Sequence, residues 1–166
     1  MNKEVELVDL VDTSGKIQKR GVPRSEADLY PDLHLQIVIG VIVDTEGRIL
    51  VHQRAKTKKV NPGDIDHVCG GVMSGETPEE AAARETMEET GVKPGNLRVI
   101  TQGINKYNRF RYLLAGESND TPGLTDPAEV EWVRFISLDE LREKQHSGEF
   151  TFVDEFFEDT ELSIQL

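Results

Sequence analysis

An unbroken apolar run at residues 37–43, which reads IVIGVIV, constrains the fold more than any other feature of the chain. All of its residues except the glycine are β-branched, which favours a strand over a helix. No polar residue alternates with the apolar ones, so we expect this strand to be buried on both faces. The run is far shorter than the roughly 20 apolar residues that span a bilayer. A strand of this kind needs cover on each side, so the sequence predicts a layered α/β sandwich.

We interpret residues 1–166 as one domain. Weaker sequence patterns predict its remaining strands, helices and loops. Residues 5–11 and 16–20 flank an Asp-Thr-Ser-Gly turn, which predicts a β-hairpin. This hairpin and an arm make up residues 1–33, and the core follows at 34–166. Within the core we expect strands at 34–43, 48–54 (pairing back on the first strand), 97–104, 107–115 and 129–136, helices at 78–90, 138–146 and 152–161, and loops at 55–66 and 117–128.

The charge balance excludes several kinds of partner. The chain has 31 acidic and 19 basic residues, for a net charge of −12, which opposes binding to a nucleic acid polymer or an anionic membrane. Small anionic substrates stay compatible, because carboxylates recruit cations that in turn bind phosphate. Cys69 is the single cysteine, and the amino terminus lacks a secretory pattern. We therefore expect a cytoplasmic protein without a disulfide framework.

Clear start and stop signals surround the helix expected at 78–90. Thr77 suits the N-cap, Pro78 suits the first helical position, and Glu80 completes a Thr-x-x-Glu capping box. Gly91 is a natural terminator. A second capping box, Ser-Leu-Asp-Glu at 137–140, opens the next helix.

The same helix gathers acidic side chains on one face. Glu88 and Glu89 follow Glu85 by three and four positions, so both neighbour it on the next turn. Clustered carboxylates repel one another, and a divalent cation removes that cost. Oxygen ligands favour Mg²⁺, with Mn²⁺ as a second option, and Mg²⁺ commonly bridges carboxylates to substrate phosphates. A solvated, glutamate-rich surface helix is the alternative interpretation.

The spacing of the segment is more specific than its charge. Residues 70–92 fit the pattern Gly-x5-Glu-x7-Arg-Glu-U-x-Glu-Glu-x-Gly-U, in which U is apolar. This pattern resembles the signature of the Nudix hydrolases, which cleave nucleoside diphosphates linked to another group. Thr86 departs from it at the first U position. The fixed letters are all present, as Gly70, Glu76, Arg84, Glu85, Glu88, Glu89 and Gly91.

The resemblance implies both a fold and a set of roles. It implies an α/β/α sandwich with a mixed sheet and a loop–helix–loop metal site, preceded here by the hairpin. Arg84 would orient a carboxylate, with Glu76 as its partner. A small diphosphate compound would be the substrate, Mg²⁺ the cofactor and a metal-activated water the nucleophile, and a homodimer is compatible with the family. The metal ligands would be Glu85, Glu88, Glu89 and the Gly70 carbonyl.

A second resemblance covers the hairpin and residues 34–71, which are similar to isopentenyl-diphosphate isomerases. Their catalytic Cys maps onto Cys69 and one His onto His34. Gly71 stands where the isomerases have a His, and a second His falls near Ala27. Their catalytic Glu falls near residues 107–110, where this chain has no acid. We therefore interpret the chain as a hydrolase of the isomerase-like branch with Cys69 as a packing residue, and keep an isomerase or a non-catalytic binding module as alternatives.

Other candidates lie outside the signature. Hydrolases of this family often use one more acid late in the fold, and Glu129 is our candidate for a catalytic acid or base, with Glu131 as a neighbour. The candidates for substrate binding are basic and aromatic, since such residues hold phosphates and stack on bases. A solvated basic loop and a charge-protected edge strand are the alternatives for them. These candidates are Arg54, Lys59, Tyr107, Arg109 and Phe110.

Overall fold

The computed structural model describes residues 4–123 and 126–165; part of the loop predicted at 117–128 lies outside these ranges. The elements follow one another as β1 (Leu7–Val11), β2 (Ile17–Pro23), the 3₁₀-helix η1 (Arg24–Leu29), β3 (Gln36–Val43), β4 (Ile49–Arg54), β5 (Ile65–Asp66), β6 (Val68–Gly71), α1 (Pro78–Thr90), β7 (Gly95–Ile104), β8 (Phe110–Glu117), β9 (Val130–Ile136), α2 (Leu138–Ser147) and α3 (Phe156–Ile164).

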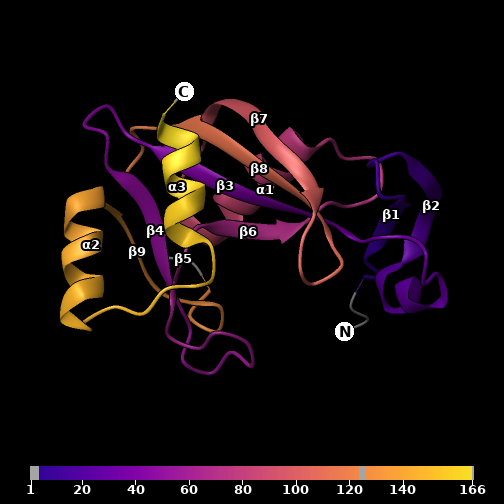
Figure 1. The fold of residues 1–166 in the computed structure, drawn as a ribbon, viewed down its shortest axis with the longest axis horizontal. Coiled ribbons are helices and arrows are strands. Elements are labelled where there is room, and N and C mark those ends of the chain that lie inside the picture. Colours follow the sequence, from indigo (N-terminus) through magenta and orange to yellow (C-terminus); the bar gives the residue numbers. More distant parts are fainter. Residues whose placement is uncertain (1–3, 124–125, 166) are drawn as a thin grey trace.

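The predicted amino-terminal hairpin is present, as β1 antiparallel to β2. It lies at one end of the molecule, beside the end of the main sheet (Figure 1). Its inner side chains form a small core of their own with η1, including Val8, Leu10, Val22 and Ala27. Within the predicted arm, β2 continues to Pro23 and η1 follows through Leu29, so the arm contains regular structure that was not predicted.

The apolar run forms the centre of the main sheet. β3 runs parallel to β8 along its whole length, from Gln36 opposite Phe110 to Val43 opposite Glu117. β7 pairs antiparallel with the far edge of β8, and β6 pairs antiparallel with residues 37–40 of β3. The sheet thus combines parallel and antiparallel pairs, as predicted.

The predicted pairing between β3 and β4 forms only next to their turn, where Val43 lies opposite Ile49. β6 occupies the edge of β3 at residues 37–40, so β4 diverges from β3 there. β4 pairs instead with β9 on one side and β5 on the other. The two short strands β5 and β6 were not predicted, because each has too few residues to show a periodic pattern.

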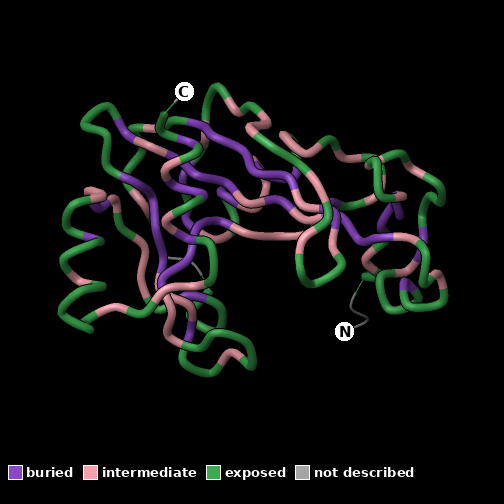
Figure 2. The backbone as a smooth tube through the Cα atoms, viewed as in Figure 1, coloured by how far each residue is buried: buried purple, intermediate pink, exposed green. Residues whose placement is uncertain are grey.

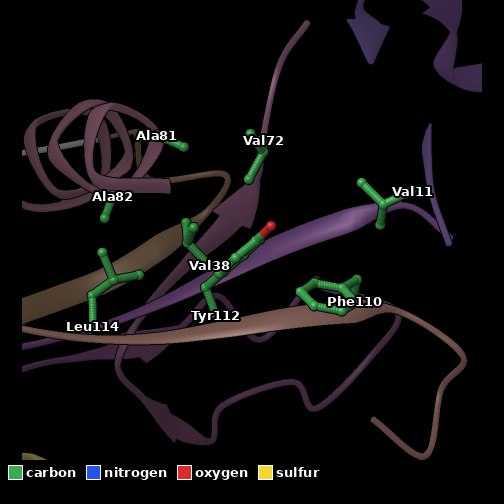
Figure 3. Packing of buried hydrophobic residues seen from close by; sticks show 8 residues of the cluster. All are labelled: Val11, Val38, Val72, Ala81, Ala82, Phe110, Tyr112 and Leu114. Carbon is green, nitrogen blue, oxygen red and sulfur yellow. The ribbon is translucent and has the colours of Figure 1, made fainter. Parts of the chain in front are cut away.

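Alternate residues of β3 face opposite layers, as a strand buried on both sides requires. On one face, Val38 packs with Ala81 and Ala82 of α1 and with Leu114 of β8 (Figure 3). On the other face, Val41 belongs to the core that α2 and α3 cover. Buried residues follow the central strands, whereas the outer side of α2 is exposed (Figure 2). The predicted α/β/α sandwich is therefore confirmed.

Three local predictions need correction. α3 begins at Phe156 rather than residue 152, because Glu155 adopts a left-handed conformation (φ 64°) immediately before it. Ser137 caps α2 by accepting from the Glu140 amide (3.2 Å), but the Glu140 carboxylate lies toward Lys144 (4.0 Å) instead of closing a capping box. The expected loop at 55–66 ends in β5. Among the described residues, no helix has both the length and the apolarity needed to cross a bilayer.

Candidate metal centre

Local sequence signals fix both ends of α1, as predicted. The Glu80 amide donates to Thr77 Oγ1 (3.1 Å) and the Thr77 amide donates to Glu80 Oε2 (2.9 Å), which completes the capping box. Gly91 ends the helix in the left-handed conformation at φ 70°, which glycine adopts without a Cβ penalty. Thr86, the one departure from the signature, is fully buried and donates its hydroxyl to the Ala82 carbonyl (2.6 Å).

Arg84 is the centre of a network that joins the helix to the loop before it. Its Nε and Nη2 donate to the two oxygens of Glu76 (2.7 and 2.9 Å), which is the bidentate contact expected from the sequence. Its Nη1 donates to Glu85 Oε1 (2.7 Å), and Nη2 also donates to the Gly71 carbonyl (2.8 Å). Hydrogen bonding to Glu76 raises the pKa of Arg84 above its usual value. Glu88 Oε2 lies farther away, at 3.4 Å.

The Glu85 carboxylate passes directly over the backbone of Gly70. A Cβ on residue 70 would overlap this carboxylate, so only glycine at position 70 leaves the Glu85 carboxylate in this place. Burial raises the pKa of Glu85, against the lowering effect of its bond to Arg84. The sequence signature thus places a glycine and a glutamate in direct contact across 15 positions of the chain.

Glu89 is the more enclosed of the two remaining acids. Its side chain is 22% exposed, Cys69 donates its amide to Glu89 Oε2 (3.3 Å), and His52 Nδ1 lies 3.9 Å from the same oxygen. Burial, followed by the charge of Glu85, raises the pKa of Glu89 well above its usual value. Glu88 is the open member of the set, with 58% of its side chain exposed.

The donor chemistry of this centre fits a hard divalent cation. Glu85 and Glu89 are partly buried carboxylates whose pKa values are raised mainly by burial, and the single cation Arg84 pairs with Glu76, Glu85 and Glu88. Ligands that are all oxygen favour Mg²⁺ or Mn²⁺. Within residues 4–123 and 126–165, no three acidic, His or Cys side chains converge closely enough to hold one ion as they stand, and Arg84 Nη1 donates to Glu85 Oε1.

A cavity of about 210 Å³ opens beside this centre. Cys69 lines it, and the backbone amide of Cys69 donates to Glu89 Oε2, although no residue of α1 is part of the cavity lining. Much of the rest of the wall is apolar. The apolar lining residues are Ile37, Ile39, Val60, Val153 and Phe156.

Each cation that lines the cavity forms an ion pair with an acidic residue of the same chain. Arg54 Nη1 lies 3.2 Å from Asp66, and the other nitrogens of Arg54 donate to the Val60 carbonyl (3.1 and 3.2 Å). The remaining pairs are Lys106 with Asp154 and Arg111 with Asp159. The cavity therefore offers little net positive charge to a ligand.

Asp66 is a candidate that the sequence analysis missed. It is buried, its carboxylate pairs with Arg54, and burial raises its pKa to about 6 although Arg54 opposes the shift. Its charge also raises the pKa values of Glu89 and Cys69, so it belongs to the same electrostatic cluster. The local sequence Asp-His-Val-Cys does not predict that Asp66 is buried, because its burial depends on packing between distant strands.

The predicted substrate-binding residues do not come together. Arg54 and Tyr107 line the cavity, and the Tyr107 hydroxyl donates to Asp154 (3.2 Å). Phe110 is only 2% exposed and packs in the core, so its ring is not available to stack on a base, and this prediction is wrong. Arg109 lies instead beside the amino-terminal arm. Lys59 is exposed in the loop after β4, outside the lining of this cavity.

Glu129 and Glu131, the candidate acids late in the chain, lie against the loop that follows β4. Glu129 pairs with Lys58, and its carbonyl accepts from the Ala55 amide (3.0 Å). Glu131 accepts from the Lys56 amide (3.0 Å). Both carboxylates thus hold the 55–58 segment in place, and the catalytic role expected for Glu129 stays a prediction.

The positions that match catalytic residues of the isomerases are also far from one another in the fold. Cys69 lines the cavity, and burial raises the pKa of its thiol. His34 lies at the junction with the hairpin, where its Nδ1 is 3.2 Å from the Asn108 carbonyl and its backbone pairs with Val11. Ala27 belongs to the small core of the hairpin.

Comparison with known proteins places this arrangement in a family. The family model described as the NUDIX domain matches residues 33–156. The chain therefore belongs to the Nudix family, and the resemblance to its isomerase-like branch is confirmed.

Curated relatives carry two kinds of name. The isopentenyl-diphosphate Delta-isomerase of Streptomyces coelicolor is 32% identical over 162 residues, covering 89% of this chain and 79% of the relative. An uncharacterised Nudix hydrolase of the same organism is 36% identical over 93 residues, covering 55% of this chain and 50% of the relative. Among solved structures, the Deinococcus radiodurans protein DR0079 superposes with a TM-score of 0.69 at 22% identity, over 95% of this chain and 99% of that one.

The buried carboxyl of Asp66 gives a pH prediction. Its pKa is about 6 in the folded protein against 3.8 for the ordinary group, so the folded state binds this proton more tightly than the unfolded state. The contribution of Asp66 to stability is therefore fully present below about pH 4 and is lost as pH rises through 6. We expect a carbon-13 titration of its carboxyl with a midpoint near 6, while Asp12, whose pKa hydrogen bonds from Ser14 lower to about 2, serves as the control. An ordinary midpoint for Asp66 contradicts this burial.

The contact between Gly70 and Glu85 gives a second prediction. Gly70→Ala displaces the Glu85 carboxylate and should weaken Mn²⁺ binding by about 10- to 100-fold, the range typical of disturbed metal-site geometry. Titration calorimetry measures the affinity. Gly40→Ala is the matched control, since a Cβ there meets its nearest neighbour at an ordinary 3.6 Å. Equal Mn²⁺ affinity in the two variants would show that Glu85 is not a ligand.

Proposed function

We propose that this protein is a Mg²⁺-dependent pyrophosphohydrolase that cleaves the P–O–P bridge of a small diphosphate compound, nucleoside-linked or otherwise. The observation that carries the proposal is the intact set of three carboxylates on α1, two of them with raised pKa values and one tied to Arg84. A non-catalytic binding module has no need to retain all of these residues. The family assignment adds independent support.

Under this proposal, each residue of the centre has a distinct role. Glu85, Glu88 and Glu89, with the Gly70 carbonyl, would hold the ion, which when bound supplies charge stabilisation for the phosphoryl oxygens and a more acidic water. Arg84 keeps Glu85 oriented through its fixed fork on Glu76. In the reaction, water oxygen bonds to phosphorus, the bond from phosphorus to the bridging oxygen breaks, and the bridge leaves with the second phosphate. A glutamate would take the proton that the water loses.

The cavity beside Cys69 suits the group attached to the diphosphate. Its cations are already neutralised by Asp66, Asp154 and Asp159, so the charged phosphates gain more at the metal centre than inside the cavity. Its apolar wall and volume of about 210 Å³ favour a compact, uncharged group. The substrate panel for an assay therefore includes nucleoside diphosphates, isopentenyl diphosphate and inorganic pyrophosphate, scored by phosphate release after a coupling phosphatase.

An isopentenyl-diphosphate isomerase is the second candidate. Two observations favour it: Cys69 lines the cavity next to Glu89, and relatives that cover most of the chain carry that name. Three observations oppose it. Burial raises the pKa of the Cys69 thiol, His34 lies at the hairpin junction, and residues 107–110, near which the catalytic Glu of the isomerases falls, include no acid.

The metal ligands give the main test. Glu88→Gln and Glu89→Gln should each lower kcat by at least about 10²-fold with the fold intact, because each removes a ligand charge. Glu79→Gln, which changes an acid on the same helix outside the triad, is the control and should keep wild-type turnover. Steady-state kinetics against Mg²⁺ concentration measure the effect. Near-wild-type turnover in both ligand variants would rule out the proposed hydrolase.

Cys69 separates hydrolysis from isomerisation. Cys69→Ala should keep hydrolysis within about tenfold of wild type, because water and not the thiol is the nucleophile in this proposal. Proton NMR of isopentenyl diphosphate incubated with wild-type protein should show no dimethylallyl diphosphate. Appearance of that isomer, abolished in a folded Cys69→Ala variant, would establish the isomerase instead.

A further inference from the structure

The amino-terminal hairpin contacts residues 73–76, the loop before α1, which we call the metal-centre loop. This loop belongs to the region matched by the NUDIX family model, whereas the hairpin does not. The Ser74 amide donates to the Leu7 carbonyl (2.8 Å), which attaches the loop to the start of β1. Arg24, at the start of η1, lies over Gly71, and its Nη1 is also 2.9 Å from Glu6. The hairpin is thus part of the surroundings of the metal centre.

Asp9 makes the most concentrated of these contacts. It is 2% exposed on β1, and its carboxylate accepts hydrogen bonds from both sides of the junction. From the metal-centre loop, Ser74 Oγ donates to it (2.6 Å) and so does the Gly75 amide (3.2 Å). From the hairpin, Arg20 Nη1 (3.0 Å) and the Gly21 amide (2.9 Å) donate. Burial alone would raise the pKa of Asp9, but these hydrogen bonds lower it overall, so the group stays ionised at neutral pH.

The loop held by Asp9 leads directly to Arg84. Glu76 follows Gly75, and the loop is closed on itself, since the Met73 amide donates to Glu76 Oε2 (2.9 Å) and the Glu76 amide donates to the Met73 carbonyl (3.1 Å). The carboxylate of Glu76 then forms the fork with Arg84. A displacement of residues 74–75 therefore moves the carboxylate that fixes the guanidinium.

We propose that Asp9 is a positioning residue: it anchors the 73–76 loop and thereby, through Glu76 and Arg84, sets the place of the Glu85 carboxylate at the metal centre. This inference rests on the proposed function, because it assigns the hairpin a part in the same site. It also explains why a buried acid stands on a hairpin that is otherwise packed by apolar residues. A buried carboxylate is costly unless it is fully hydrogen-bonded, and here half of its partners come from the loop.

The hairpin itself provides a matched control. Asp12 also has a carboxylate that accepts several hydrogen bonds, from Ser14 (2.9 Å from the amide, 2.6 Å from the hydroxyl), the Lys16 amide (3.2 Å) and Gln18 Nε2 (2.8 Å). All of these donors lie within the hairpin turn and β2. Loss of the Asp12 charge should therefore lower hairpin stability without changing the hydrogen bonds of Arg84.

The experiment compares four variants: Asp9→Asn, Ser74→Ala, Ser74→Thr and Asp12→Asn. An asparagine at position 9 loses the charge and turns an NH₂ group toward donors, and alanine at position 74 removes only the hydroxyl. Nitrogen-15 NMR of the Arg84 Nε–H group reports its fork with Glu76 independently of activity, and calorimetry gives the Mn²⁺ affinity. Thermal unfolding shows which variants are folded at the assay temperature.

We expect Asp9→Asn and Ser74→Ala to shift or broaden the Arg84 Nε–H signal and to weaken Mn²⁺ binding by about 5- to 20-fold, near the range for lost hydrogen bonds that orient metal ligands. Ser74→Thr, which keeps the hydroxyl, should restore both readouts. Asp12→Asn should leave both unchanged even where it lowers the melting temperature. If Asp9→Asn fails to fold, the pair at position 74 provides the same comparison.

Two results would overturn the inference. One is a folded Asp9→Asn or Ser74→Ala variant with a wild-type Arg84 signal and wild-type Mn²⁺ affinity. The other is an equal change in Asp12→Asn, which would reduce Asp9 to a general stabiliser of the hairpin. Failure of the hydrolase proposal looks different, because turnover would then survive Glu88→Gln while the Arg84 signal still responded to Asp9.

Discussion

The Arg84 guanidinium is the interaction on which the rest of the site depends. It is one planar cation that meets Glu76, Glu85 and the Gly71 carbonyl at once, so it joins the loop, the helix and strand β6. Charge-assisted, bidentate hydrogen bonds of this kind fix direction as well as distance. A lysine would supply the charge but not the fork. The positions of three separate segments thus follow from a single side chain.

Close packing and chemistry use the same residues around this cation. Ala81 and Ala82 let α1 approach the sheet, and the absent side chain of Gly70 leaves the space that Glu85 fills. The helix is therefore near enough for its carboxylates to be partly buried. That burial raises the pKa values of Glu85 and Glu89 and gives them their demand for a cation. A helix held farther from the sheet would carry the same acids in solvent, without that demand.

The parts of this structure that the sequence predicted are those with local causes. The ends of α1 follow from Thr77, Glu80 and Gly91, which act within one turn of the helix. The pairing of β4 with β9 and the buried place of Phe110 depend on contacts between distant segments, and no local pattern encodes them. Asp66 shows the same limit at the site, because its raised pKa comes from burial by strands and from the helix Phe156–Ile164, far along the chain. Long-range burial, rather than residue type, decided which polar residues joined the site.

The hairpin shows that the signature segment does not position itself unaided in this chain. Its loop at residues 73–76 closes with two internal hydrogen bonds, and such short loops are ordinarily mobile at the surface. Asp9 and the Leu7 carbonyl add three more hydrogen bonds from outside the matched region. Under the proposed function, ordering the loop in advance would reduce the conformational entropy lost when metal and diphosphate bind. Under the same proposal, a hairpin outside the matched region would affect how tightly the centre holds an ion.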